Sequence, residues 1–339
     1  MTVTQDSAEA STKAEQRQIS QILVWVRRLR QRQSILSTFI PLAILWIALT
    51  IASPHFLTSD NILNVLLNAA PLSLIAGGMT LALIAAEIDL SVGSVVALIG
   101  SLSALLMVNY HVPWFAAMLA AFAAGALVGI INGWFATRLG MPSFVATLAM
   151  LGIARGVALL ITQGQAIYGL PSIFNVMGQG DVGPIPIPVI IAAGVLLVLH
   201  LVLTQTKFGL NVYAVGGNPE AARLSGVNVP GVKMAVLILS ALLASLSGLI
   251  LAARLDAGSG TVGGDLLLDA IAAVVIGGTS LLGGTGRVTG TILGVLLIAS
   301  IRNGLVLLNV SAFWQQVAIG ALILLAVSLD YLAKGPRRA

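Results

Sequence analysis

The chain contains no cysteine, few aromatic residues and few charges. Of its 339 residues none is Cys, 5% are aromatic and 9% are charged. Without cysteine neither a disulfide framework nor a thiolate metal site can form, and the three histidines are too scattered to hold a metal. The patterns HExxH, GxSxG and GxxxxGK followed by Ser or Thr are also missing. We therefore predict no catalytic residue, no metal, no cofactor and no ATP hydrolysis by this polypeptide.

Hydrophobic residues are abundant, at 58% of the chain, which is more than the core of a soluble domain could cover. A lipid bilayer accepts this composition, and the 36 glycines let helices approach closely within it. The formal net charge of +5 is attributed to basic cytoplasmic loops and not to nucleic-acid binding. No basic stretch followed by a short apolar core opens the chain, so we expect no cleaved signal peptide.

Ten apolar runs approach the roughly 20 residues that a membrane-spanning helix needs. They cover residues 35–53, 69–86, 90–108, 114–137, 144–162, 187–203, 232–252, 266–282, 288–301 and 313–332. The predicted fold class is all-α, a polytopic membrane helical bundle of about ten transmembrane helices. The predicted divisions are a cytoplasmic N-terminal tail at 1–33, one membrane domain at 34–333 and a cytoplasmic C-terminal tail at 334–339.

The basic residues predict the orientation of the bundle. With ten spans and a cytoplasmic N-terminus, 14 of the 17 Lys and Arg residues lie on the cytoplasmic side. The segments on the other side, at 54–61, 109–113 and 163–186, contain no Lys or Arg. The positive-inside rule expects this partition. We therefore predict an inner-membrane protein with both termini in the cytoplasm.

Two glycine ladders point to an internal repeat. In each ladder the glycines are four residues apart and fall on one stripe of a helix, which favours close helix contact. The ladders are Gly125, Gly129 and Gly133, and Gly286, Gly290 and Gly294. They fall in the fourth and ninth runs, which cross the membrane in opposite directions, as in the inverted repeats of transporters. Chance in a glycine-rich chain is the alternative.

The longest polar cytoplasmic segment, residues 205–231, contains the signature of a short helix. Asn218 suits the N-cap, Pro219 the first helical position and Gly226 the end of the helix. A helix of about seven residues is marginal alone in water. It is therefore predicted either to sit in a receiving groove of a partner or to serve as a solvated connector.

Four stretches resemble the permease subunits of bacterial ABC importers for ribose, arabinose, xylose and related sugars. They are GGMTLALIAAEIDLSVGSVVAL at 77–98, MPSFVATLAMLGIARGVALLITQG at 141–164, FGLNVYAVGGNPEAARLSGVNV at 208–229 and LDAIAAVVIGGTSLLGGTGRVTGT at 268–291. The resemblance covers residues 53–330, with the stretches in the same order. One departure is Glu87, where members of the family often carry glycine or another small residue.

The resemblance implies a transmembrane subunit that pairs with a second permease copy, identical or sibling, and carries a cytoplasmic ABC ATPase. A periplasmic sugar-binding protein would dock on the other face, and ATP would be used only by the partner ATPase. The short polar helix would then be the coupling helix seated in the ATPase. Its residues are Gly217, Asn218, Pro219, Glu220, Ala221, Ala222, Arg223, Leu224, Ser225 and Gly226.

Three charged residues lie at or near membrane depth. Glu87 and Asp89 separate the second and third runs, and a carboxylate at the bilayer centre costs about 3 kcal/mol. Asp89 is predicted to cap the third helix by accepting N–H bonds near Ser91, with a broken helix that lines a path as the alternative. Arg155, inside the fifth run, is expected to make an ion pair or interhelical contact, with Asp269 as a candidate partner.

Polar side chains within the runs are candidates for lining a path, because a sugar needs donors and acceptors in place of water. Interhelical hydrogen bonding is the alternative role for each. The candidates are Glu87, Asp89, Ser91, Asn132, Asp269, Thr279, Ser280 and Asn303. The leading prediction is a permease subunit for a monosaccharide or related polyol. The competing hypothesis is an ion-coupled secondary transporter in which Glu87 and Asp89 handle protons or sodium.

Overall fold

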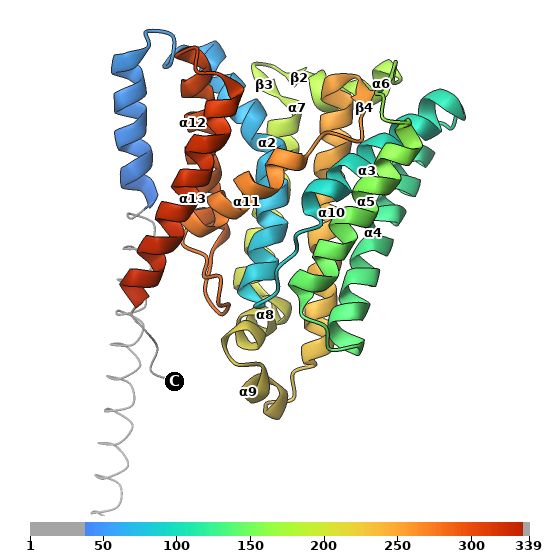
Figure 1. Ribbon diagram of the computed structural model, residues 1–339, viewed down its shortest axis with the longest axis vertical. Helices are drawn as coiled ribbons and strands as arrows, with labels where there is room; N and C mark the ends of the chain where they lie inside the picture. The colour runs from blue at the N-terminus through green and yellow to red at the C-terminus, as the bar shows by residue number, and fades with distance from the viewer. Residues whose placement is uncertain (1–37, 335–339) are drawn as a thin grey trace, which may run out of the picture.

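The structure is a computed structural model that describes residues 38–334. The predicted tail at 1–33, the start of the first run and the chain from 335 onward lie outside the described residues. Helices dominate the described part (Figure 1). Its strands are two residues long and form two small antiparallel ladders, β1 (Ile167–Tyr168) with β4 (Ala257–Gly258), and β2 (Asp181–Val182) with β3 (Ile185–Pro186). The predicted all-α class is confirmed.

The described helices follow the ten predicted runs. They are Thr38–Ala52, α2 (Ser59–Ile84), α3 (Val92–Ala104) with the π-helical turn η1 (Leu105–Asn109), α4 (Trp114–Arg138), α5 (Ser143–Thr162), α6 (Ser172–Gln179), α7 (Ile187–Gln205), α8 (Lys207–Gly217), α9 (Pro219–Leu224), α10 (Val229–Leu255), α11 (Gly264–Ile276), α12 (Val288–Leu307) and α13 (Ala312–Lys334). Among the described residues seven helices are long and apolar enough to cross a membrane. Three shorter apolar stretches correspond to the first, tenth and eighth runs. They are the helix Thr38–Ala52, residues Ala312–Leu325 of α13, and α11.

Two predicted boundaries are wrong by several residues. The second helix begins at Ser59 and not near 69, because polar residues in its first turns hid it from a search for apolar runs. Its start is nevertheless capped, since the Thr58 hydroxyl accepts a hydrogen bond from the Asn61 N–H. The eighth run ends early: α11 stops at Ile276, and Gly278 takes a positive φ of 85° that an L side chain rarely adopts. Residues 277–287 are therefore a loop.

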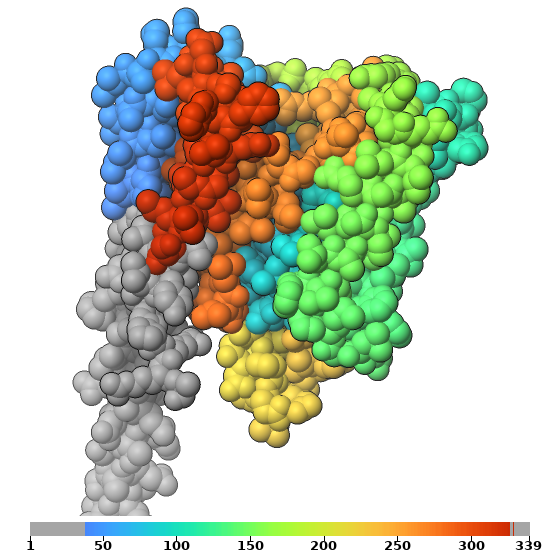
Figure 2. All heavy atoms as spheres, in the orientation of Figure 1, coloured from blue at the N-terminus to red at the C-terminus, as the bar shows by residue number. Residues whose placement is uncertain are grey.

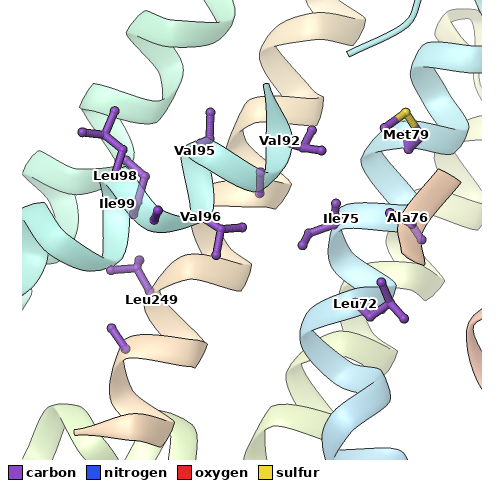
Figure 3. Close-up of a cluster of buried hydrophobic side chains, with 14 of the residues drawn as sticks. Leu72, Ile75, Ala76, Met79, Val92, Val95, Val96, Leu98, Ile99 and Leu249 are labelled. Atoms are coloured by element: carbon purple, nitrogen blue, oxygen red, sulfur yellow. The ribbon is translucent and has the colours of Figure 1, made fainter. Parts of the chain in front are cut away.

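The centre of the bundle is formed by α2 and α10, which pack against each other, and α10 also packs against α3 and α4. Leu72, Ile75 and Met79 of α2 belong to one buried apolar cluster with the side chains of α3 and with Leu249 of α10 (Figure 3). Lipid tails are as apolar as leucine, so close van der Waals packing and not transfer from water holds such helices together.

The packing follows a twofold pattern that agrees with the predicted inverted repeat. α2 packs against α12 as α10 packs against α4, and α3 contacts α4 and α5 as α11 contacts α12 and α13. The first glycine ladder faces α10 along α4, where a Cβ at Gly129 would lie 2.6 Å from the Ile238 Cα atom. In the second ladder Gly290 and Gly294 face α11, but Gly286 precedes α12, so that ladder is shorter than predicted.

The bundle has two distinct ends. α8 and α9 project at one end, called here the α9 end, whereas α6 and the β2–β3 ladder cover the opposite end (Figure 1). The helix Thr38–Ala52 starts, and α13 finishes, toward the α9 end (Figure 1). Both described chain ends therefore lie on the same side of the bundle, as an even number of passes requires.

Candidate translocation path and docking helix

The predicted short helix is present as α9, at the tip of the α9 end. The Asn218 Oδ1 atom accepts a hydrogen bond from the Ala221 N–H at 3.0 Å, and Gly226 ends the segment with a φ of 83°. Both the N-cap and the terminating glycine are therefore as predicted. The helix is polar and exposed: Arg223 donates to Glu220 at 2.7 Å with both side chains more than half exposed. Leu224 is 82% exposed.

A second helix at this end, α8, was missed by the reading of residues 205–231 as a polar loop. Its N-cap is Thr206, whose hydroxyl accepts a hydrogen bond from the Gly209 N–H at 3.1 Å. Val212 and Val215 are buried against the bundle. The signal was present in the sequence as a threonine cap followed by apolar residues at helical spacing. It was obscured by three glycines within eleven residues.

The end of α8 forms a close three-way contact, the glycine junction, made by Ile84, Gly216, Gly283 and Gly284. A Cβ at Gly216 would overlap the Ile84 carbonyl oxygen and lie 2.8 Å from the Gly284 nitrogen. The Gly284 N–H donates to the Ile84 carbonyl at 2.9 Å. The Tyr213 hydroxyl of α8 adds a bond to the Gly286 carbonyl at 2.8 Å. α8 therefore contacts both the end of α2 and the 277–287 loop.

The third pass begins with a segment that is not helical. This segment, residues 85–91, joins Ile84 at the end of α2 to Val92 at the start of α3. Irregular backbone within a membrane protein needs partners for its polar groups. α5 supplies them: the Ser143 hydroxyl accepts from the Ile88 N–H at 3.0 Å, and the Thr147 hydroxyl accepts from the Leu90 N–H at 3.1 Å. The break is thus built into the packing of α5.

Asp89 lies within this break, and the predicted N–H bond near Ser91 is present, although it does not cap α3. Its Oδ1 atom accepts from the Ser91 N–H at 3.0 Å and from the Ser91 hydroxyl at 2.6 Å, whereas α3 begins at Val92 without a side-chain cap. The predicted alternative, a broken helix, fits better. The Asn132 amide donates to the Ser91 hydroxyl at 3.0 Å, so three predicted residues form one buried chain of hydrogen bonds.

Glu87 is buried at the start of the break and forms an ion pair with Lys233 of α10. The Lys233 side chain is 28% exposed, so the pair sits at the margin of the packed interior. Lys233 follows the α8–α9 segment closely in the chain. The ion pair therefore ties the broken third pass to the helix that leads away from α9.

The eighth pass contains a second break, at residues 256–263 before α11. Arg155 of α5 supports it by donating to the Gly260 carbonyl at 2.6 Å and the Val262 carbonyl at 3.2 Å. The predicted Arg155–Asp269 pairing is wrong. Asp269 instead pairs with Arg302 of α12, with Nε to Oδ2 at 2.7 Å and Nη2 to Oδ1 at 2.9 Å. Sequence spacing alone could not choose between the two arginines.

The two broken passes meet inside the bundle. A Cβ at Gly93, in the first turn of α3, would lie 2.6 Å from the Gly263 carbonyl oxygen at the start of α11. A Cβ at Gly263, where φ is 87°, would in turn overlap the Gly93 carbonyl oxygen. The N-terminal ends of two half-helices therefore touch, as in the discontinuous helices that place binding sites in transporters.

A polar cavity of about 550 Å³ lies between α2, the end of α10, α11, α12 and the start of α13. The end of α10 and the start of α13 lie toward the end of the bundle opposite α9 (Figure 1). In the space-filling view α11 is recessed between α13 and α5 (Figure 2). The polar lining residues are Asn68, Arg254, Thr261, Asp265, Asp269, Arg302, Asn303 and Gln315.

Two of the predicted path residues, Asp269 and Asn303, line this cavity, and the others lie elsewhere. The Asn303 amide exchanges two hydrogen bonds with the Asn61 amide, at 2.8 and 3.0 Å, as its alternative role predicts. Thr279 and Ser280 belong to the 277–287 loop near the glycine junction. Sequence reasoning did not single out Arg254 as a lining residue, because nothing local in the sequence distinguishes a lining arginine from an interfacial one.

A membrane-crossing helical bundle with two broken passes, a polar cavity and an exposed helix at the opposite end has the architecture of a membrane transport protein. The family model described as branched-chain amino acid transport system / permease component matches residues 61–327. The chain belongs to this permease family.

Relatives at high identity include three sugar permeases. The ribose import permease of Bacillus subtilis (strain 168) is 43% identical over 297 residues, which cover 87% of this chain and 92% of the relative. The D-allose transport system permease of Escherichia coli (strain K12) is 38% identical over 296 residues, 87% of this chain and 91% of the relative. The xylose transport system permease of Haemophilus influenzae (strain ATCC 51907 / DSM 11121 / KW20 / Rd) is 36% identical over 337 residues, 81% and 90% of the two chains.

Proposed function

We propose that this chain is the transmembrane permease subunit of an ATP-driven ABC importer that carries a monosaccharide or related polyol across the bacterial inner membrane. The names of the relatives, which describe ribose, allose and xylose transport, support the substrate class. The α9 end faces the cytoplasm, together with both termini. Basic residues at that end support this orientation under the positive-inside rule. They are Arg138, Lys207, Arg223, Lys233 and Arg287.

The observation that carries the proposal is the exposed helix α9. It is six residues long, capped at its start, and it exposes a leucine and an ion pair beyond the bundle. A helix this short gains little stability alone in water, so its retention at the tip is explained by a partner that receives it. The proposed partner is a cytoplasmic ABC ATPase, which binds and hydrolyses the ATP.

The glycine junction gives this docking a route into the bundle. When the ATPase moves α9, the rigid α8 helix presses on the end of α2 and on the 277–287 loop at the same time. The contact with the end of α2 leads into the break at residues 85–91 of the third pass. The contact with the 277–287 loop lies at the end of α11, in the eighth pass. One motion at the α9 end would therefore act on both breaks and alternate access to the path.

Two further partners complete the proposed importer. A periplasmic sugar-binding protein docks at the end opposite α9, where the polar cavity lies. A second permease copy covers the recessed face between α5 and α13 (Figure 2). Exposed apolar side chains along α5 and α13 support a face that meets lipid or another copy, including Leu148, Ile153, Phe313 and Val317.

The docking of α9 is tested by replacing Leu224 with Asn and, separately, Glu220 with Gln or Arg223 with Gln. We expect the protein to insert normally while co-purification of a P-loop ATPase falls, or ATP hydrolysis continues without uptake. Leu139→Asn is the matched control, because Leu139 is a 57% exposed leucine at the end of α4, outside α8 and α9. Full coupled uptake in all three α9 variants would rule out the docking assignment.

The relatives, which are import and transport-system permeases, do not favour the ion-coupled carrier, and reconstitution tests it directly. The permease alone in liposomes should take up no sugar when a proton or sodium gradient is applied. Uptake by the single polypeptide would favour the carrier, with Glu87 and Asp89 as the titrating groups. The ion pair of Glu87 with Lys233 supports a structural role for that carboxylate instead.

A further inference from the structure

The polar cavity has the size of a binding pocket for one small solute. Its volume of about 550 Å³ lies within the roughly 300–1,000 Å³ of ligand pockets in proteins. Its walls combine polar side chains with apolar ones, including Leu72, Leu251, Val262 and Leu266. A monosaccharide presents the same combination, because its hydroxyl groups lie around a ring whose C–H faces are apolar.

Several polar residues of the cavity are already engaged with each other. Asp269 is held by Arg302 through two contacts, and the Asn303 amide is paired with that of Asn61. These groups form a fixed part of the wall. The Asp269–Arg302 ion pair has no net charge, so it contributes shape and local dipoles to the wall without attracting an ionic ligand.

Arg254 and Asp265 have hydrogen-bonding capacity to spare. Arg254 donates to the Asn68 side-chain oxygen at 3.0 Å and to the Leu67 carbonyl at 3.4 Å, and within residues 38–334 it forms no ion pair. A guanidinium carries five N–H donors, so several remain for a ligand. Asp265 accepts a bond from Gln316 at 2.8 Å, and a carboxylate has about four acceptor positions.

The charges of the cavity balance. Its lining carries two arginines, Arg254 and Arg302, and two aspartates, Asp265 and Asp269. A neutral solute leaves this balance intact, whereas an ionic solute adds a charge that must leave water and approach like charges. Hydroxyl groups suit such a wall because each can donate to a carboxylate and accept from a guanidinium.

We propose that this cavity is a sugar site of the permease itself, in which Arg254 donates to and Asp265 accepts from the hydroxyls of a neutral monosaccharide. The inference rests on the proposed function, since it assumes that a sugar enters from the end opposite α9. It adds a second selection step after the binding protein. The site accepts neutral sugars and discriminates against sugar acids and amino sugars.

The test uses the permease–ATPase complex in nanodiscs, without the periplasmic binding protein. Saturation-transfer NMR measures binding of D-ribose, D-xylose and D-allose, and of D-ribonate and D-glucosamine as charged probes. We expect at least one neutral sugar to bind and to exceed both charged probes by tenfold or more. Arg254→Gln should weaken that sugar at least tenfold, with partial recovery in Arg254→Lys. Asp265→Asn should raise the relative binding of D-ribonate about fivefold.

The matched control is Asp181→Asn, which removes an exposed carboxylate of β2 outside the cavity lining and should leave every value unchanged. Thermal unfolding of each variant in the same nanodiscs checks that the fold is retained. If Arg254→Gln does not retain the fold, the Asp265→Asn comparison decides. The inference is overturned if no probe binds the wild-type complex, or if folded variants bind and discriminate as the wild type does.

Failure of this inference is distinguishable from failure of the proposed function. The same complex is supplied with the binding protein, and uptake into liposomes is measured. Uptake that persists while the cavity variants behave as wild type means that the cavity is an unselective passage, and the importer assignment stands. Absence of both an associated ATPase and uptake means that the proposed function is wrong.

Discussion

The two breaks in the bundle are both supported by α5, but with different side chains. At residues 85–91 the hydroxyls of Ser143 and Thr147 accept hydrogen bonds from backbone N–H groups, and the Thr147 hydroxyl also donates to the Ile88 carbonyl at 3.0 Å. At residues 256–263 the Arg155 guanidinium donates to two backbone carbonyls. A hydroxyl can both accept and donate, whereas a guanidinium only donates, so the first break has partners for its N–H and carbonyl groups and the second has a donor for its carbonyls.

The breaks also differ in what else holds them. The break at 85–91 follows the glycine junction directly and is tied to α10 by the Glu87–Lys233 ion pair. The break at 256–263 runs into the polar cavity, where Thr261, Val262 and Gly263 form part of the wall. The first is therefore placed to receive motion from α8 and α9, and the second to sense the solute.

The largest effect is expected from Gly216→Ala at the glycine junction. A Cβ there overlaps the Ile84 carbonyl oxygen, so α8 must move away from α2 and the link from α9 to the first break is lost. Sugar uptake by the reconstituted importer should fall more than tenfold, whereas ATP hydrolysis continues. Gly194→Ala in α7 is the matched control, because a Cβ at Gly194 meets nothing within 4 Å and this glycine lies outside the predicted coupling helix. Equal uptake in the two variants would show that α8 does not transmit the motion.

The supports given by α5 are compared by Arg155→Met and Thr147→Val. The first leaves two carbonyls without their charged donor and should lower the free energy of unfolding by about 3 kcal/mol, with charge-assisted bonds the stronger kind. The second removes one hydroxyl and should cost about 1–2 kcal/mol. Unfolding in mixed micelles measures both changes. A larger loss in the free energy of unfolding for Thr147→Val than for Arg155→Met would contradict this expected order.

The smallest effect is expected from the coupling between Glu87 and Lys233. Lys233→Met leaves a buried carboxylate unpaired and should destabilise more than Glu87→Gln, and the double variant should recover part of the loss. Because Lys233 is partly exposed, the coupling energy from the double-mutant cycle should be about 1 kcal/mol. Additive single effects would mean that the pair does not hold the first break.

Predictions from the sequence succeeded where the signal is local. The cap, the first-position proline and the terminating glycine of α9 lie within nine residues, and the structure shows all three. The order of the ten apolar runs also follows from counting along the chain. The predicted start of α2 was wrong, because the first turns of this helix carry polar residues that a search for apolar runs excludes.

By itself the sequence determined a helical membrane bundle, its approximate passes and a capped helix in its polar segment, because these depend on composition and short spacing. Tertiary structure alone decided that Asp269 meets Arg302 and not Arg155, and that Ile84 meets Gly284 across 200 positions of the chain. It also assembled the cavity from five helices. Such contacts depend on how helices are placed against each other. For side chains on different membrane passes, the separation along the sequence does not indicate which of them meet in space.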